Sequence, residues 1–172
     1  AASTLTLNGA SVVRGTITVD DGTVDAEGSF DATGGNITFN DDGNLTLFST
    51  VESLGTLSNG NGTVTYDGAD DQDIVEDDYY NLTAGGGSGT KTLGGAVTVA
   101  GDLTIDTDVT IAMDTHLLTV TNIADIDGTL AVADNTLTLD GASDIDGTIT
   151  ISTGTVDGND VFDAENGSIT FT

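Results

Sequence analysis

The sequence predicts an all-β protein, a parallel β-solenoid (β-helix) of roughly eight short coils, and three observations lead to this fold class. Apolar-Thr-apolar triplets recur along the chain, which is the period-2 alternation of strands with one buried face. Tight-turn pairs such as Asp-Gly, Asn-Gly and Gly-Gly separate these triplets about every 6–10 residues. The 24 glycines, together with many β-branched residues, leave no window that favours a helix.

The expected strands follow one another along the whole chain, and in each of them Thr faces outward between two inward apolar residues. Their central triplets are 5–7, 17–19, 37–39, 45–47, 64–66, 97–99, 103–105, 109–111, 137–139, 149–151 and 169–171. Strands this short, with turns this frequent, favour stacked coils of about 20 residues over a β-sandwich, whose strands are longer. β-sandwich domains joined by donor-strand exchange are the alternative fold.

Residues 1–172 are expected to form a single acidic domain. The chain has 29 Asp and Glu residues but only two basic ones, Arg14 and Lys91, so its formal net charge is −27. Nucleic acids are excluded as partners because binding them needs Lys and Arg to displace counterions. No stretch approaches the roughly 20 apolar residues of a membrane span, so no membrane insertion is expected.

The sequence repeats itself on two scales. Residues 124–130 match residues 143–149 at an offset of 19, about the length of one coil. Residues 5–39 match residues 137–171 without a gap at an offset of 132, and 21 of these 35 positions are identical. The end of the chain is therefore a second copy of its beginning.

Two explanations of the long repeat stay open. The chain covers one module of a longer array plus the start of the next, or its matching ends let identical subunits stack head to tail. Strands are expected close to both ends, with no polar cap of the kind that keeps solenoids soluble. Uncapped coils expose unpaired backbone groups that pair with another chain, and contacts that do not close into a ring give filaments. Self-assembly is therefore expected.

One segment of the sequence is similar to a known type of repeat. Residues 62–105 carry Thr-Val-Thr-Tyr at 63–66, Tyr-Tyr-Asn-Leu-Thr at 79–83 and Gly-Thr-Lys-Thr-Leu at 89–93. This pattern resembles the Gly/Thr/Asp-rich β-helix repeats of large bacterial surface and secreted adhesin-like proteins. The resemblance implies an extracellular or cell-surface location and an adhesive or scaffolding role. It implies no catalytic residues.

Aspartates at the turns are the candidate metal ligands. If the offset of 19 is one coil, Asp125 lies above Asp144 and Asp127 above Asp146. Carboxylates about 4.8 Å apart repel one another, and calcium is the cation that prefers such oxygen ligands. The alternative is that these are ordinary solvated turn residues, because Asp is common in turns. No other cofactor is expected.

The remaining candidates are modification sites, because no catalytic constellation is present. Sequons for N-glycosylation occur at Asn36, Asn44, Asn61, Asn81 and Asn166. The single histidine, His116, has no partners for a triad or a metal site, so no enzyme is expected. We expect an extracellular structural protein whose main partner is itself, in a head-to-tail filament or surface layer. A spacer or adhesion module facing a carbohydrate or mineral surface is the first alternative, and a polysaccharide-acting β-helix enzyme is the second.

Overall fold

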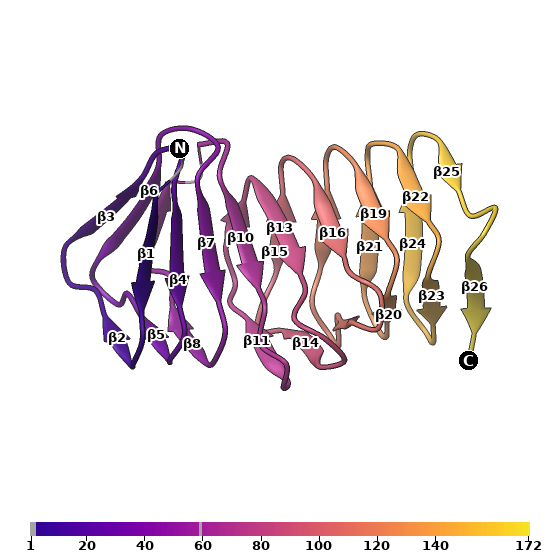
Figure 1. The fold of residues 1–172 in the computed structure, drawn as a ribbon. Helices are drawn as coiled ribbons and strands as arrows, with labels where there is room; N and C mark the ends of the chain where they lie inside the picture. The colour runs from indigo at the N-terminus through magenta and orange to yellow at the C-terminus, as the bar shows by residue number, and fades with distance from the viewer. Residues whose placement is uncertain (1–2, 59) are drawn as a thin grey trace.

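The chain winds into a parallel β-solenoid whose coils stack along one axis (Figure 1). A computed structural model describes residues 3–58 and 60–172. Its strands succeed one another on three faces in turn, and strands on the same face pair from one coil to the next, except between β8 and β11 and between β9 and β12. Every pairing found among the described residues is parallel. The prediction of a solenoid is confirmed, and the β-sandwich alternative is wrong.

The first face is one continuous sheet of nine strands. They are β1 (Thr4–Leu7), β4 (Thr23–Ala26), β7 (Asn44–Leu47), β10 (Thr63–Tyr66), β13 (Asn81–Ala84), β16 (Leu103–Ile105), β19 (Ala124–Ile126), β22 (Ser143–Ile145) and β25 (Phe162–Asp163). The solenoid therefore has about nine coils, close to the eight expected.

The second face consists of a short sheet followed by a longer one. The short sheet is β2 (Ser11–Val12), β5 (Phe30–Asp31) and β8 (Val51–Ser53), and the longer sheet is β11 (Gln72–Ile74), β14 (Thr90–Leu93), β17 (Thr110–Ala112), β20 (Thr129–Val132), β23 (Thr148–Ile151) and β26 (Ser168–Phe171).

The third face is divided in the same way. Its short sheet is β3 (Thr16–Val19), β6 (Asn36–Phe39) and β9 (Thr56–Ser58), and its longer sheet is β12 (Asp78–Tyr79), β15 (Val97–Val99), β18 (Leu118–Val120), β21 (Thr136–Leu139) and β24 (Thr155–Gly158).

Pairing partners on the first face fix the length of a coil, which varies slightly along the solenoid. The coil is shorter where Thr63 pairs with Asn81 than where Leu82 pairs with Leu103. Inward residues stack into columns, because the strand alternation sends every second side chain to the axis. One such column contains Leu45, Val64, Leu82 and Leu103, none of them more than 1% exposed. The stacked apolar columns are the core of the protein.

The two copies of the long repeat fold alike but occupy different faces. Strands β1, β2 and β3 correspond to β21, β22 and β23, because the sequence offset of 132 carries each onto its counterpart. With three strands per coil, 20 strands amount to six coils and two strands. As a result, β1 is on the first face and β21 on the third, so the second copy is rotated by one third of a turn.

Candidate functional site: the two open ends of the solenoid

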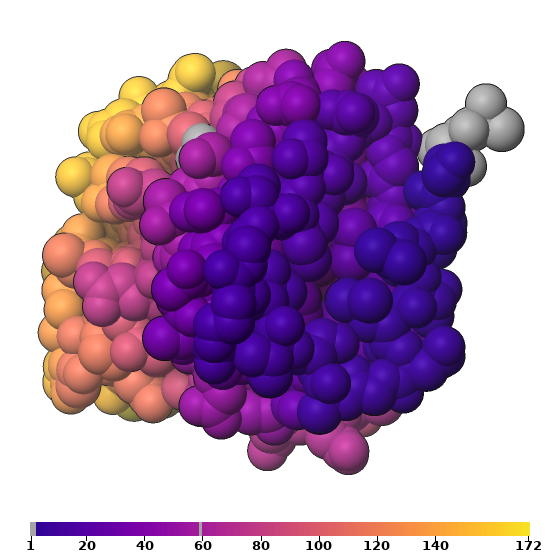
Figure 2. Space-filling model, turned by 90° about the vertical axis from the view of Figure 1, so that its left-hand side faces the viewer, coloured from indigo at the N-terminus to yellow at the C-terminus, as the bar shows by residue number. Residues whose placement is uncertain are grey.

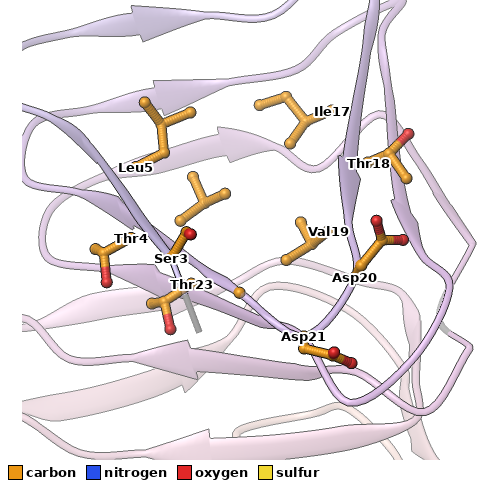
Figure 3. Close-up of a pocket in the computed structure, with 11 residues that line it drawn as sticks. Ser3, Thr4, Leu5, Ile17, Thr18, Val19, Asp20, Asp21 and Thr23 are labelled. Carbon is orange, nitrogen blue, oxygen red and sulfur yellow. The ribbon is translucent and has the colours of Figure 1, made fainter. Parts of the chain in front are cut away.

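The N-terminal end of the solenoid exposes its core. Figure 2 looks onto this end, where the indigo first coil faces the viewer. A hollow of about 420 Å³ lies there between β1, β3 and β4. Figure 3 shows Leu5 and Ile17 on opposite sides of the hollow with Val19 beside them. Leu5 and Ile17 are inward positions of the first coil that no other coil of the described residues covers, and Leu5 is 52% exposed, whereas Val19 is only 3% exposed.

The C-terminal end is open in the same way. A hollow of about 470 Å³ is lined by residues of the last four strands, among them Val156, Phe162, Ile169 and Phe171. Ile169 and Phe171 point along the inward columns of the second face, since they pair with Ile149 and Ile151 one coil below. The last coil therefore carries an apolar surface that continues the core.

The internal repeat shows how these exposed residues are covered elsewhere in the same chain. Ile37 and Phe39 are the counterparts of Ile169 and Phe171, and they are only 0% and 3% exposed. The C-terminal pair is 42% and 77% exposed. Strands β6 and β26 differ at one position of four. The difference in exposure therefore comes from the coil above β6, which β26 lacks among the described residues.

The backbone edges of both ends are also unpaired within the described chain. Strands β1, β2 and β3 each begin a sheet, and β24, β25 and β26 each end one. Such edges offer a row of N–H and C=O groups to another strand. Hydrogen-bonding groups and apolar side chains thus coincide at each end.

The predicted calcium ligands lie on the first face and at the corner that follows it. Asp125 pairs with Asp144 as predicted, and Asp144 pairs with Asp163 in the next coil. All of the predicted ligands are exposed. Partial burial, and then the negative charges of Asp127, Asp144 and Asp146, raise the pKa of Asp125. The four carboxylates therefore interact with one another.

The described residues contain no group of three or more His, Cys, Asp or Glu side chains arranged to hold a metal ion. Asp146 accepts a hydrogen bond from the Asn166 side chain at 3.1 Å, which occupies one of its oxygens. Asp125, Asp144 and Asp163 thus form a column of like charges on neighbouring coils, here called the aspartate column. Calcium binding to it stays a prediction.

The five sequon asparagines lie at strand starts or turns on the outside of the solenoid. Asn36, Asn61 and Asn166 are exposed, whereas Asn44 and Asn81 are half-buried. The Asn81 side chain is the most engaged: it donates to the Asn61 carbonyl at 3.3 Å and accepts from the Asp102 N–H at 2.9 Å. A glycan on Asn81 would disturb this contact between coils, so the fully exposed asparagines suit modification better.

A third hollow, of about 470 Å³, lies on the side where β8 and β11 separate. It is lined by four carboxylates, those of Glu52, Asp73, Glu76 and Asp77. Burial raises the pKa of Asp77, and a hydrogen bond from the Asp78 N–H partly opposes this. No aromatic side chain lines the hollow to serve as a platform for a sugar ring. The absence of enzyme activity itself stays a prediction.

Sequence reasoning left the place of Lys91 open, and the structure buries this residue completely. Its ammonium group donates one hydrogen bond each to the carbonyls of Gly68 and Asp70 and to the side-chain oxygen of Gln72. All three N–H groups of the ammonium are therefore used. The alternation Thr90-Lys91-Thr92-Leu93 already contains the signal, because Lys91 shares its phase with the inward Leu93.

A pair of tyrosines is also buried in the core. The Tyr66 and Tyr79 hydroxyls are 3.0 Å apart, and Tyr79 donates to the Val75 carbonyl at 2.7 Å. Burial raises the pKa of both tyrosines. The segments that resemble adhesin-like repeats contain Tyr66, Tyr79 and Lys91. In this chain these residues form buried hydrogen bonds in the coils that follow the break between β8 and β11 and between β9 and β12.

No protein-family model, curated protein or solved structure matches the chain. The likeness to adhesin-like repeats therefore rests on the residues of the motif alone. The described residues contain no helix that could serve as a transmembrane span.

Proposed function

We propose that this chain is an extracellular structural protein that associates end to end into a filament or surface layer. The observation that carries the proposal is the contrast between Phe39 and Phe171. Equivalent residues are buried under a further coil in the first copy of the repeat and exposed at the C-terminal end. A coil from another molecule would bury them in the same way.

The energetic gain of such a contact is substantial. Fully burying one large apolar side chain contributes about 1.5–3 kcal/mol, and each junction would cover several, including Leu5 on one side and Ile169 and Phe171 on the other. Parallel strand pairing would be added on three faces. The contact is heterologous, and each added copy is displaced along the solenoid axis, so the assembly propagates as a filament instead of closing into a ring.

The extracellular location is supported by the resemblance to surface and secreted proteins and by the acidic composition. A spacer or adhesion module within a longer array remains the alternative. In that case the next module of the same chain covers β24–β26, and the long repeat favours this reading as much as self-assembly. A carbohydrate or mineral surface would then be the partner of the solenoid faces.

Negative-stain electron microscopy and sedimentation of the 172-residue chain test the proposal. We expect thin unbranched filaments from the unaltered chain. Phe171→Asp should shorten or abolish them, because it places a charge in the apolar junction.

Leu117→Asp is the matched control, since Leu117 is 45% exposed in the middle of the solenoid. It should leave the filaments intact, and both variants should keep the melting temperature of the parent to within a few degrees. Particles that stay monomeric at high concentration in the unaltered chain would contradict self-assembly and favour the spacer module.

A further inference from the structure

We infer that successive copies join with a rotation of one third of a turn, so that β1, β2 and β3 of one copy extend β24, β25 and β26 of the copy below. This inference rests on the proposed end-to-end association and specifies its register. The alternatives place β1 on β25, without rotation, or on β26.

The helical path of the chain distinguishes the three registers. Each coil rises by one strand spacing, about 4.8 Å. Each end of the solenoid is therefore not flat: its height rises gradually around the coil and drops by one strand spacing at one point, like a ramp. At the upper end β24 is the lowest strand of the last coil and β26 the highest; at the lower end β1 comes first. The two ramps meet without a gap only when β1 follows β26 along the helix, which places it on β24. Either other register leaves at least one strand position empty.

The chain contains a template for this junction. The last coil, β24–β26, is the repeat counterpart of β4–β6, and the strands above β4–β6 are β7, β8 and β9. In the sequence, residues 4–24 match residues 44–64 at an offset of 40, and 8 of these 21 positions are identical. The first coil therefore resembles the coil that covers β4–β6, chiefly on β1 and around β3.

On β1 and β3 its inward residues repeat those of the template, whereas next to and on β2 Arg14 and Ser11 stand where the template buries Leu54 and Val51. Leu45 and Leu47 lie over Val24 and Ala26 in the pairing of β4 with β7. The matching residues Leu5 and Leu7 of the next copy would lie over Val156 and Gly158. On the neighbouring strands, Leu57 covers Ile37, and Ile17 of the next copy would cover Ile169.

Three glycines of the template make close contacts, and the first coil keeps two of them. The third, Gly60, matches Asp20 in the first coil, although a Cβ on Gly60 would lie 2.1 Å from the Phe39 carbonyl oxygen. A Cβ on Gly62 would lie 2.2 Å from Cγ of the Phe39 ring, so only glycine lets the coil pass over that ring. Gly22 occupies the matching position and would pass over Phe171.

A Cβ on Gly55 would lie 2.4 Å from the carbonyl oxygens of Ala32 and Gly35. Gly15 matches Gly55, and nothing in the chain lies within 4 Å of a Cβ built on it. The space beneath Gly15 is therefore open to the equivalent backbone, at Ala164 and Gly167, of the copy below.

Disulfide cross-linking tests the register, because the chain has no cysteine of its own. Paired residues on adjacent strands are about 4.8 Å apart, which is within the roughly 4.4–6.8 Å that a disulfide spans. Three double variants share Thr6→Cys and differ in the second site: Asp157→Cys on β24, Asp163→Cys on β25 or Thr170→Cys on β26. All four positions are exposed and point outward. Thr6→Cys alone is the control for links between equivalent cysteines.

Mild oxidation should convert the Thr6→Cys/Asp157→Cys variant into a ladder of covalent oligomers on a denaturing gel, and leave the other two as monomers. A ladder from the Asp163→Cys or Thr170→Cys variant, or filaments that link in none of the three, would overturn the register while self-assembly stands. No ladder together with no filaments of the unaltered chain would overturn self-assembly, and the register with it.

Helical reconstruction of the filament gives an independent measurement. The described residues of one copy form 26 strands, or eight and two-thirds coils, so the axial rise per copy should be about 42 Å. Each step should carry the first face onto the third face of the copy below, a rotation of about one third of a turn plus the twist of the sheets. A step that keeps the first face aligned would contradict the inference.

Discussion

Two charged residues show how the surroundings of a side chain change its pKa. Lys91 occupies an inward column whose next residue is Ile111, and it tolerates burial because three oxygens accept its protons. Burial lowers the pKa of this ammonium, and the nearby carboxylate of Asp67 opposes the shift. Asp125 lies at the surface, and its pKa is raised first by partial burial of the carboxylate and then by the like charges of Asp127 and Asp144.

The raised pKa of Asp125 predicts how the stability of the protein depends on pH. A carboxyl group whose pKa is higher in the folded protein holds more protons there, so its contribution to stability falls as the pH rises through that range. Asp125→Asn should therefore raise the melting temperature at pH 7, by about 1–4 °C for a cross-strand like-charge pair. The gain should vanish below about pH 3.9, where the unfolded aspartate is also protonated.

Asp25→Asn is the control for this measurement. Asp25 occupies the same outward column of the first face but lies between Thr6 and Thr46. Its charge contributes only a minor part of the raised pKa of Asp67, so its replacement should change the melting temperature at pH 7 less than Asp125→Asn does. If Asp125→Asn lowers the melting temperature at pH 7, the aspartate column has a stabilising role, and the predicted calcium site at Asp125, Asp127, Asp144 and Asp146 becomes the first explanation to test by titration.

At the scale of the strand and coil, the outward threonines and inward aliphatic residues were predictable, because a period of two fixes the face of each residue. The interruption between β8 and β11 was not. There Gln72 links two coils, because its side-chain amide donates to the Leu47 and Ser49 carbonyls of the coil below. Such a bridge joins residues that are more than one coil apart in the sequence, so no local pattern reveals it.

The close fit of Gly62 to Phe39 can be tested directly. Gly62→Ala should destabilise the protein by about 1–3 kcal/mol, because the added methyl group overpacks against a buried ring. Combining it with Phe39→Leu should recover part of the loss, as expected for residues in contact. Thermal or denaturant unfolding measures both effects.

Gly9→Ala is the matched control, since a Cβ on Gly9 meets nothing within 4 Å. It should change stability by no more than about 0.5 kcal/mol. Equal effects of Gly9→Ala and Gly62→Ala would contradict the packing argument and weaken the template for the junction between copies.

At the scale of the whole molecule, electrostatic repulsion between copies opposes the end-to-end association that the apolar open ends favour. Arg14 pairs with Asp31 at 3.1 Å, the one ion pair found within residues 3–58 and 60–172, and the formal net charge is −27. Two copies meeting end to end bring these charges together. Apolar burial at the junction acts over contact distance, whereas the repulsion extends over a Debye length.

Filament formation should therefore increase with salt. Between 0.01 M and 0.15 M ionic strength the Debye length falls from about 30 Å to about 8 Å, so the fraction of chain that pellets on ultracentrifugation should rise. Calcium and sodium chloride compared at equal ionic strength separate screening from specific binding: a larger effect of calcium indicates bound ions. A pelleted fraction that falls as salt rises would contradict an apolar junction.

The sequence by itself determined the class of fold, the approximate length of a coil and the existence of two copies of one segment. Local alternation, turn residues and self-similarity carry that information. Only the tertiary structure decided that the copies occupy different faces. Coil length varies along the solenoid, as the pairs Thr63–Asn81 and Leu82–Leu103 show, so the offset between the copies does not reveal how many strands it spans. The stacking of each strand on the coil below sets that number, and it turns matching ends into a junction with a defined rotation.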